Sequence, residues 1–208
     1  KGKLIVVEGA CDGIGKSTQF ELLQKHLTED GATVASHHFP SYNTFHGRPV
    51  EEYLHGTFGK PSELSPYFVN SLYAVDRAMA WNLELGPKYE EGEILVLDRY
   101  TTSSLIYQSA LIEDIEERKK FIDYVCDFEY NKLGIKRPDK VIFLFLPYQY
   151  RPLVGEVADS KYHNIEMTYH LLSRRYDFGV VSCVNDDKLK DINSISDEVL
   201  EYVKNIIK

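Results

Sequence analysis

Short segments dominated by apolar residues recur along the chain and alternate with segments whose apolar residues lie three or four positions apart. The first apolar segment, Lys3–Glu8, is typical of a buried strand. Thr18–Thr28 follows it, with Phe20, Leu23 and Leu27 at helical spacing. The same pattern predicts four more strands, at Ala32–His38, Glu93–Leu97, Val141–Leu146 and Val180–Val184. Apolar strands that alternate with helices predict an α/β fold, in which helices cover both faces of a five-stranded parallel sheet.

Three longer helical segments and one loop complete this pattern. A helix is predicted to begin at Ser65-Pro66, because serine is a favourable N-cap and proline is tolerated in the first turn. Tyr107–Asn131 is predicted to be largely helical, and Ile195–Ile207 to form the closing helix. Phe39–Gly47 is interrupted by Pro40 and is predicted to be a loop. Since no repeat or linker divides the sequence, we expect residues 1–208 to form a single domain.

A glycine-rich turn joins the first predicted strand to the first predicted helix. It reads Gly9-Ala10-Cys11-Asp12-Gly13-Ile14-Gly15-Lys16-Ser17-Thr18. Glycines let successive backbone N–H groups face a phosphate at a helix N-terminus. Lys16 would add a positive charge near the β- and γ-phosphates of ATP, and the Ser17 hydroxyl can bind Mg²⁺.

This turn departs from the strict pattern G-x-x-x-x-G-K-[ST], because Ala10 stands where the first glycine belongs. The strand before it and the helix after it nevertheless provide the context that the pattern requires. We therefore predict a P-loop NTPase fold with an irregular Gly9–Asp12 arc. The predicted ATP- and phosphate-binding residues are Gly13, Ile14, Gly15, Lys16, Ser17 and Thr18.

The carboxyl ends of the predicted strands are where a parallel α/β sheet binds its ligands. Three segments are predicted to meet there: Gly9–Lys16, Phe39–Gly47 and Asp98–Tyr100. The last of these places a carboxylate and a guanidinium at the end of an apolar strand. We expect a ligand site at this edge, although an ordinary strand exit would also explain Asp98 and Arg99.

Composition and charge narrow the range of partners. A formal net charge of −8 argues against a nucleic-acid partner, which normally requires a basic surface. No apolar run approaches the roughly 20 residues that span a bilayer. The first apolar run ends at Glu8 and is too short for a signal peptide, so we expect a cytoplasmic protein that does not associate with membranes.

The cysteines and histidines show no spacing typical of a metal site or a disulfide framework. The three cysteines are isolated and are interpreted as reduced thiols. Cys11 lies near a helix N-terminus, where it is a candidate for a reactive thiolate. The seven histidines, including His37 and His38, which a strand points to opposite faces, are interpreted as structural.

Read as EG-x-x-DG-x-GKST, the loop resembles that of the thymidylate kinase family, and four later segments agree in the same order. HHFPSYNT-x-x-G resembles the family's loop after the second strand, and SLYAVDRA resembles its base-binding helix. LDRYTTSSLIYQ and LGIKRPDKVIFL resemble the segments that follow. The resemblance covers about Lys3 to Leu146. It implies phosphorylation of dTMP to dTDP by ATP, with Mg²⁺ as cofactor and a homodimer formed through helices.

The resemblance implies which residues bind the nucleoside of dTMP. Tyr73 would stack on thymine and Arg77, four positions later on the same helix face, would donate to its O4. A guanidinium only donates, so it suits this carbonyl and disfavours the amino group of cytosine. Ser104 would lie near the base and the Tyr107 ring would fill the space of a ribose 2′-OH. Phe39 belongs to the same site, and its bond to the following proline is suggested to be cis.

The residues alone leave alternatives open for two of these positions. Tyr73 is equally compatible with a place in the core, and Arg77 with a surface ion pair to Asp76 or Glu84. Tyr107 is also compatible with ordinary helix packing.

At the phosphate end, the resemblance implies that Arg99 and Tyr42 hold the acceptor phosphate. Asp98 would lie near Mg²⁺, with Ser17 as the other metal-binding residue. Asp12 would lie near the sugar 3′-OH. Lys16, Asp12 and Arg99 are therefore the predicted catalytic residues.

The family usually carries an arginine-bearing lid after the fourth strand, and here the sequence departs from it. The lid-like segment, at about residues 147–164, has only Arg151 and Lys161, opposed by Glu156 and Asp159. Arg174 and Arg175 are predicted to lie on the next helix, in a surface role. A kinase for another nucleotide or deoxynucleoside, or a weakly catalytic nucleotide-binding paralogue, therefore remains an alternative.

Overall fold

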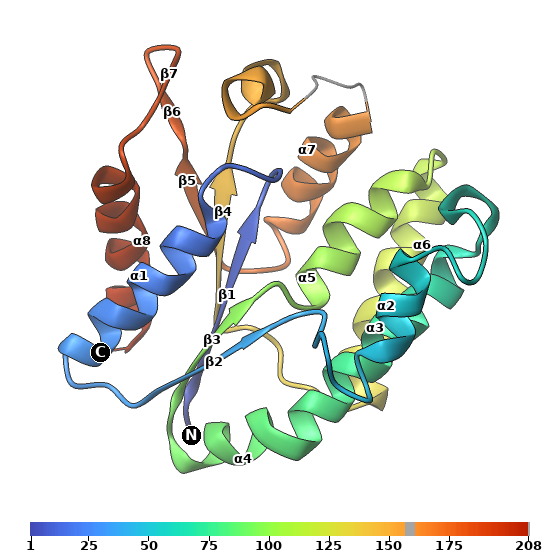
Figure 1. Cartoon of the computed structure of the whole chain (residues 1–208), viewed down its shortest axis with the longest axis horizontal. Helices are drawn as coiled ribbons and strands as arrows, with labels where there is room; N and C mark the ends of the chain where they lie inside the picture. Colours follow the sequence, from blue (N-terminus) through green and yellow to red (C-terminus); the bar gives the residue numbers. More distant parts are fainter. Residues whose placement is uncertain (157–160, 208) are drawn as a thin grey trace.

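A computed structural model of the chain describes residues 1–156 and 161–207 and has a five-stranded parallel sheet at its centre (Figure 1). The strands are β1 (Lys3–Gly9), β2 (Val34–His38), β3 (Ile94–Asp98), β4 (Lys140–Phe145) and β5 (Phe178–Ser182). Their spatial order is β2-β3-β1-β4-β5, and every neighbouring pair is parallel. The predicted α/β fold with a five-stranded parallel sheet is confirmed.

Helices cover both faces of this sheet (Figure 1). On one face α1 (Lys16–Glu29) packs against α8 (Ile192–Ile207). The other face carries α3 (Pro66–Ala80), α5 (Thr101–Ser103), α6 (Ile115–Cys126) and α7 (Lys161–Leu172). Two shorter helices, α2 (Arg48–Leu54) and α4 (Gly86–Glu91), lie beside and after α3, and β6 (Val184–Asn185) pairs with β7 (Lys188–Leu189) in a small hairpin. Within the described residues, no helix has both the length and the apolar composition needed to cross a membrane.

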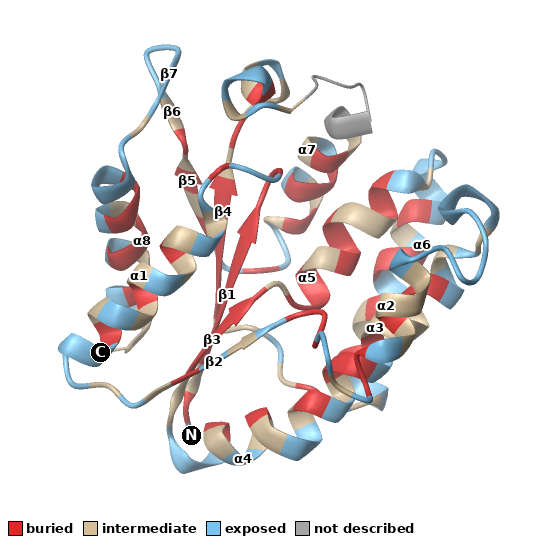
Figure 2. Cartoon of the chain, in the orientation of Figure 1, coloured by how far each residue is buried: buried red, intermediate tan, exposed pale blue. Residues whose placement is uncertain are grey.

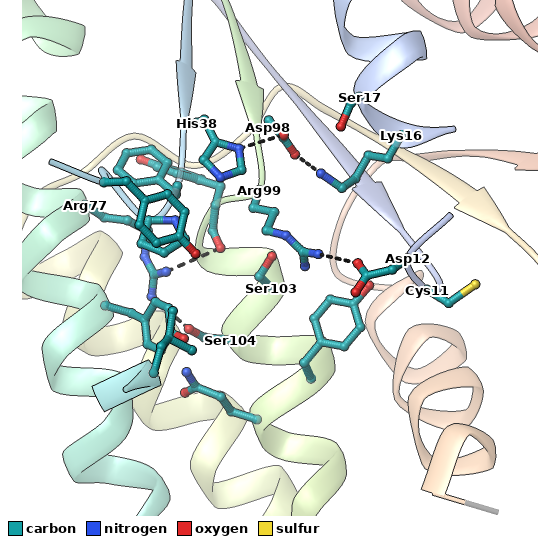
Figure 3. Close-up of a pocket in the computed structure, with 18 of the residues that line it drawn as sticks. Cys11, Asp12, Lys16, Ser17, His38, Arg77, Asp98, Arg99, Ser103 and Ser104 are labelled. Carbon is teal, nitrogen blue, oxygen red and sulfur yellow. Dashed lines mark hydrogen bonds and ion pairs between the residues drawn. The ribbon is translucent and has the colours of Figure 1, made fainter. Parts of the chain in front are cut away.

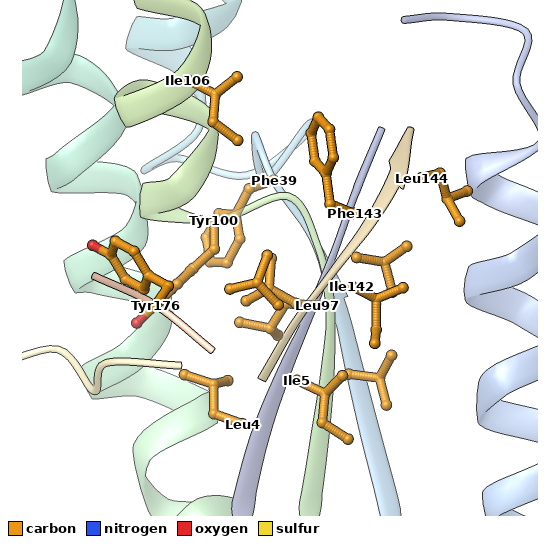
Figure 4. Packing of buried hydrophobic residues seen from close by; sticks show 14 of the residues in the cluster. Leu4, Ile5, Phe39, Leu97, Tyr100, Ile106, Ile142, Phe143, Leu144 and Tyr176 are labelled. Atoms are coloured by element: carbon orange, nitrogen blue, oxygen red, sulfur yellow. The ribbon is translucent and has the colours of Figure 1, made fainter. Parts of the chain in front are cut away.

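The core is centred on the middle strands, which are buried on both faces (Figures 2 and 4). Leu4, Ile5, Leu97 and Ile142 have no solvent exposure at all. Each such aliphatic side chain contributes about 1.5–3 kcal/mol when it leaves water. The carboxyl ends of β1, β3 and β4 are therefore held in place by the most completely buried part of the molecule.

Several element boundaries differ from the sequence-based prediction by a few residues, and two of these differences have a clear physical cause. Tyr107–Asn131 is not one helix, because the chain becomes extended at Ile112 and α6 begins only after Asp114. The Asp114 side chain accepts the Glu117 backbone N–H at 2.8 Å, so it caps α6 and starts a new helix. The second strand begins at Val34 and not at Ala32, because the Ala32 N–H still bonds to the Leu27 carbonyl at the end of α1.

The start of α3 and the end of α7 can also be compared with the prediction. α3 begins at Pro66 as expected, although the Ser65 side chain makes no capping hydrogen bond. α7 ends at Leu172, so the prediction that Arg174 and Arg175 lie on it is wrong. Arg175 pairs with Asp123 at 2.6 Å on the surface, which agrees with the expected surface role.

Only part of the predicted lid-like segment can be described. Tyr148–Val154 form a short 3₁₀ helix, η6, directly after β4. Residues 157–160, which include Asp159, lie outside the described residues, as does the side chain of Lys161.

Candidate active site

A cavity of about 780 Å³ opens at the carboxyl ends of the central strands (Figure 3). The three segments predicted to meet at this edge all contribute to its wall. Its lining includes most of the predicted site residues, namely Asp12, Gly13, Gly15, Lys16, Ser17, Thr18, Phe39, Tyr42, Tyr73, Arg77, Asp98, Arg99, Ser104 and Tyr107. Ile14 is the exception, since its side chain is buried in the core and only its backbone can face a ligand.

The phosphate loop curls tightly at the N-terminus of α1. Gly13 and Gly15 have φ values of 77° and 89°, a left-handed conformation that favours glycine. A Cβ on Gly13 would also lie 2.9 Å from the Val154 carbonyl oxygen, so η6 packs directly against the loop. Lys16 and Ser17 then begin the helix, with the Ser17 side chain exposed to the cavity.

The residue that breaks the strict loop pattern is absorbed by the sheet. Gly9 pairs with Leu144 in the β1–β4 register, and the Ala10 N–H continues the ladder with a 3.0 Å bond to the Leu144 carbonyl. A Cβ on Gly9 would lie 3.3 Å from Cδ of Lys16. The close approach of a glycine to the lysine side chain is therefore kept, and the irregularity lies on the strand side of the loop.

Cys11 follows in this arc and does not have the properties of a reactive thiol. It is buried, and burial raises the pKa of its thiol to about 11. The thiolate is the nucleophilic form, so burial of Cys11 does not favour the alternative of a reactive thiolate.

The carboxylate of Asp98 is held from two sides at the phosphate end of the cavity (Figure 3). Lys16 Nζ donates to its Oδ1, and Nδ1 of His38 lies 2.7 Å from its Oδ2. Burial alone raises the pKa of Asp98, but the hydrogen bonds from His38 and Lys16 outweigh burial and hold the pKa below its usual value. The group is therefore an anion held between two donors.

His38 was interpreted as structural from the sequence, yet it lines the cavity. It ends β2 in register with Asp98, the last residue of β3. The available signal was its place at the carboxyl end of a predicted parallel strand, directly before Phe39. The predicted cis bond between Phe39 and Pro40 is present.

Arg99 occupies the centre of the cavity wall, between Asp12 and Tyr107. Its φ of 65° is unusual for a residue with a side chain and turns the guanidinium into the cavity. A guanidinium nitrogen lies 3.7 Å from the Asp12 carboxylate, which is 86% exposed. Its carbon lies 5.4 Å from the centre of the Tyr107 ring. Arg99 is thus held loosely enough to take another anion.

A carboxylate that the sequence did not single out, Glu8, lies behind this wall. It is fully buried and accepts hydrogen bonds from the hydroxyls of Thr102 and Ser103, both at 2.7 Å. Burial raises the pKa of Glu8 despite the opposing effect of the nearby positive charge of Arg99. Glu8 therefore fixes the start of α5, which directly follows Arg99 and Tyr100.

The other end of the cavity contains a buried ion pair. Nε and one terminal nitrogen of Arg77 each donate to Glu129 at 2.7 Å, and that nitrogen also donates to Ser104 Oγ at 2.8 Å. The second terminal nitrogen lies 3.5 Å from the Tyr100 carbonyl oxygen. Arg77 is buried, so the alternative of a surface ion pair is wrong. Glu129, on the segment after α6, was missed because it is far from Arg77 in sequence.

Two further side chains complete this end of the cavity. The Tyr73 ring lies 5.9 Å from the Arg77 guanidinium carbon, and burial raises the pKa of its hydroxyl to about 12. Gln108 also lines the cavity, and its Oε1 is buried with no hydrogen-bond partner in the described part of the chain. Gln108 was not predicted, although it lies four residues after Ser104 on the same helical segment.

Arg151, expected on the lid, is turned toward the phosphate loop and not into the cavity. It is 3% exposed, with one guanidinium nitrogen 3.5 Å from the Ala10 carbonyl oxygen and another 3.8 Å from Glu156. It therefore joins η6 to the phosphate loop.

Known proteins resemble this chain over most of its length. The family model described as thymidylate kinase matches residues 7–187. The thymidylate kinase of Schizosaccharomyces pombe is 24% identical over 99% of this chain and 93% of its own length. That of Chlamydia caviae is 31% identical over 80% of this chain and 77% of its own length.

Other relatives match a shorter region. The thymidylate kinase of Bifidobacterium longum subsp. infantis is 37% identical over 52% of this chain and 46% of its own length, so the match spans about half of that relative. The crystal structure of thymidylate kinase from Ehrlichia chaffeensis superposes with a TM-score of 0.70 and 20% identity, covering 98% of this chain and all of that one. The shared fold is that of the P-loop NTPases. On the family model and these relatives together, the chain belongs to the thymidylate kinase family.

Proposed function

We propose that this protein transfers the γ-phosphoryl group of ATP to dTMP, giving dTDP and ADP. One observation carries the proposal: a single cavity joins the phosphate loop, through Arg99, to the buried Arg77–Glu129 pair. Its ends suit the two chemical parts of a pyrimidine nucleotide, an anionic phosphate and a base with a carbonyl edge.

At the donor side, the loop around Gly13 and Gly15 offers backbone N–H groups at the start of α1 to the ATP phosphates. Lys16, now paired with Asp98, would move to the β- and γ-phosphates when ATP binds. Positioning and neutralisation of charge supply most of the rate in this chemistry, because the acceptor oxygen is already anionic and needs no general base.

The oxygen atoms of Ser17 and Asp98, which line this end of the cavity, suit Mg²⁺. Mg²⁺ usually keeps several waters and takes only one or two protein oxygens beside those of the nucleotide. The Ser17 hydroxyl is exposed in the first turn of α1 and is the better candidate for direct contact. Both oxygens of Asp98 are already hydrogen-bonded, so it suits contact through a water molecule. When bound, the metal neutralises charge on the phosphoryl group being transferred.

The acceptor phosphate would lie between the donor loop and Arg99. Arg99 has a loose contact with Asp12, and a phosphate can replace that contact with a bidentate one. Tyr42, half-exposed on the cavity wall, would donate its hydroxyl from the opposite side. The exposed Asp12 would accept from the sugar 3′-OH.

The base would be read by one donor and one acceptor. Four of the five N–H groups of Arg77 already have acceptors, which leaves one on the terminal nitrogen near Tyr100 to donate to O4 of thymine. Oε1 of Gln108, which has no hydrogen-bond partner among the described residues, would accept the N3–H of the same base. Cytosine offers the opposite pattern at both atoms, so the pair would favour thymine.

The test is a coupled assay of the purified protein with ATP, Mg²⁺ and a panel of acceptors: dTMP, dUMP, dCMP, UMP and thymidine. We expect dTMP to give the highest kcat/KM. If thymidine or a ribonucleotide gave a higher kcat/KM than dTMP, that compound would be the acceptor and the proposal would be wrong.

A weakly catalytic nucleotide-binding protein is the second candidate, and the position of Arg151 favours it. Arg151 packs against the loop backbone and is not among the residues that line the cavity, whereas the lid arginines of this family neutralise the phosphoryl group. Tight ATP binding combined with turnover near the uncatalysed rate would support this candidate.

We also propose that the protein forms a homodimer through α3. Phe68, Val75, Met79 and Leu83 lie along one side of α3 and of the π-helical segment Trp81–Leu85 that continues it, and each is about 40–60% exposed. Such a contiguous apolar stripe is typical of a surface that a partner covers. Sedimentation equilibrium should give twice the chain mass, and Met79→Glu should give monomers.

A further inference from the structure

His38 lines the cavity and contacts residues on both the donor side and the acceptor side of its phosphate end. Its Nδ1 lies 2.7 Å from Asp98 Oδ2. Its ring stacks on Tyr42, with ring centres 5.8 Å apart and planes inclined by 24°. Figure 3 shows the contact of His38 with Asp98. Asp98 ends β3 and Tyr42 belongs to the loop after β2, so His38 connects two separate elements.

The two donors to Asp98, Lys16 and His38, are expected to respond differently when ATP binds. Lys16 is the residue that the donor phosphates compete for, so its bond to Oδ1 is broken in the reacting complex. The carboxylate torsion of an aspartate is soft, because it is a terminal sp³–sp² bond with broad minima. Without a second donor, Asp98 would be free to turn once Lys16 left. The bond from His38 to Oδ2 prevents this.

Tyr42 depends on the same imidazole. Its side chain is half-exposed, and one of its ring contacts is the stacking with His38. A tyrosine hydroxyl that contacts an acceptor phosphate must be held before the phosphate arrives, since ordering a free side chain on binding costs affinity.

We propose that His38 is a positioning residue that keeps Asp98 aimed at the metal-binding mouth while Lys16 passes to ATP, and that keeps Tyr42 aimed at the acceptor phosphate. This inference rests on the proposed kinase function. The neighbouring histidine differs from His38 in this respect. His37 points to the other face of the strand, where its Nε2 lies 2.7 Å from Ser41 Oγ, and it is not among the residues that line the cavity.

Two substitutions separate the two contacts. His38→Asn keeps an N–H donor at the position of Nδ1 but removes the ring beside Tyr42. His38→Phe keeps the ring but removes the donor to Asp98. His26→Asn, on the far end of α1 beside Glu29, is the matched control and should stay within about twofold of wild type.

We expect His38→Phe to lower kcat about tenfold, the usual scale for losing a hydrogen bond to a charged group, with KM for dTMP changed less than about threefold. His38→Asn should keep kcat within about threefold and raise KM for dTMP about three- to tenfold. Calorimetric titration of dTMP without ATP provides a readout independent of turnover, and it should show weaker binding for the asparagine variant alone.

The outcomes are separable from those of the proposed function. A wild type that does not phosphorylate dTMP overturns the proposed function. If wild type is active and His38→Phe retains full kcat, the inference is wrong. It is also wrong if both variants lose kcat together with their melting temperature, because that result shows a purely structural role.

Discussion

Two ion pairs, one at each end of the cavity, each join a basic side chain to a carboxylate but differ in how deeply they are buried. Lys16–Asp98, at the phosphate end, has side chains that are 11% and 6% exposed, and Asp98 has a second donor in His38. Arg77–Glu129, at the base end, has side chains that are 2% and 0% exposed. Glu129 is further bound by the Thr101 hydroxyl at 2.8 Å, so both of its oxygens are occupied within the protein.

The difference shows how one cavity can combine an ion pair that a ligand can replace with an ion pair that stays fixed. The pair at the phosphate end can be exchanged for pairs with a ligand, because both of its residues line the cavity. A pair in the interior cannot be broken without leaving a buried charge, which is costly. The exchangeable pair suits the moving phosphoryl group, and the fixed pair suits a base that must be distinguished from others.

Removing one partner of the fixed pair should have the largest effect. Glu129→Ala leaves the buried Arg77 without its counter-charge, at an expected cost of about 3–5 kcal/mol in the free energy of unfolding. Urea denaturation would measure it. The double variant Arg77→Met with Glu129→Met removes both charges and should recover most of the loss. If Glu129→Ala lowered the free energy of unfolding by less than about 1 kcal/mol, the Arg77–Glu129 pair would not be a fixed pair.

Removing the exchangeable cation should change catalysis and leave the fold intact. Lys16→Met should lower kcat at least about a hundredfold, which corresponds to about 2.7 kcal/mol of activation free energy. Its melting temperature should stay within a few degrees of wild type, because Asp98 keeps its bond to His38. More than about a tenth of wild-type turnover in this variant would contradict the role of the phosphate loop.

The base end should determine which pyrimidine is accepted. Wild type should prefer dTMP and dUMP over dCMP, and the double variant Arg77→Met with Glu129→Met should narrow that preference by about 1–3 kcal/mol. Steady-state kcat/KM for the three acceptors measures this. Equal losses for all three would mean that Arg77 only supports the fold.

Tyr107, between the two ends, should determine which sugar is accepted. A ribose hydroxyl against its ring would collide or be buried without a partner, at a cost of about 1–3 kcal/mol. We expect dUMP to be phosphorylated at least about tenfold more efficiently than UMP, and Tyr107→Ala to close much of that gap. Similar kcat/KM values for the two acceptors in wild type would return Tyr107 to a packing role.

The smallest effect concerns Glu8 and the pH dependence of stability. Burial raises the pKa of Glu8 in the folded chain, so the folded state binds this proton more tightly than the unfolded state. The resulting stability is complete below the unfolded pKa of about 4.3 and is lost as pH rises through the folded pKa. Glu8→Gln stays neutral throughout. Its melting temperature relative to wild type should therefore rise between pH 4 and pH 8, and a flat difference would contradict the direction of the shift.

Residues adjacent in sequence to a motif were predictable, and residues brought there by the fold were not. Lys16, Arg99 and Tyr107 each follow a strand or helix whose pattern is clear, so the sequence indicates where they lie. Glu129 lies 52 positions from Arg77, and nothing in its local sequence marks it as the partner. The same limit explains Glu8, whose acidic side chain in a strand gives no sign that two hydroxyls satisfy it.

Boundaries and orientations were the other source of error. The sequence assigned Arg151 to the lid-like segment but did not indicate which way its side chain points. Its direction depends on how η6 packs on Gly13 and Ala10, which only the fold determines. The break at Ile112 was missed for a similar reason, since the Asp114 cap competes with an apolar pattern that continues through it.

The one-residue extension of β1 has a consequence for how such chains can vary. Because the ladder to β4 simply gains a bond at Ala10, an insertion upstream of Gly13 leaves the spacing from Gly13 to Thr18 unchanged. The number of residues on the strand side of the loop can therefore vary while the phosphate-binding turn from Gly13 to Thr18 is kept. An insertion after Gly13 would instead displace Lys16 from this turn. Mutational tolerance should be asymmetric about Gly13, so a search pattern anchored at Lys16 and read backwards finds chains that a fixed-spacing pattern overlooks.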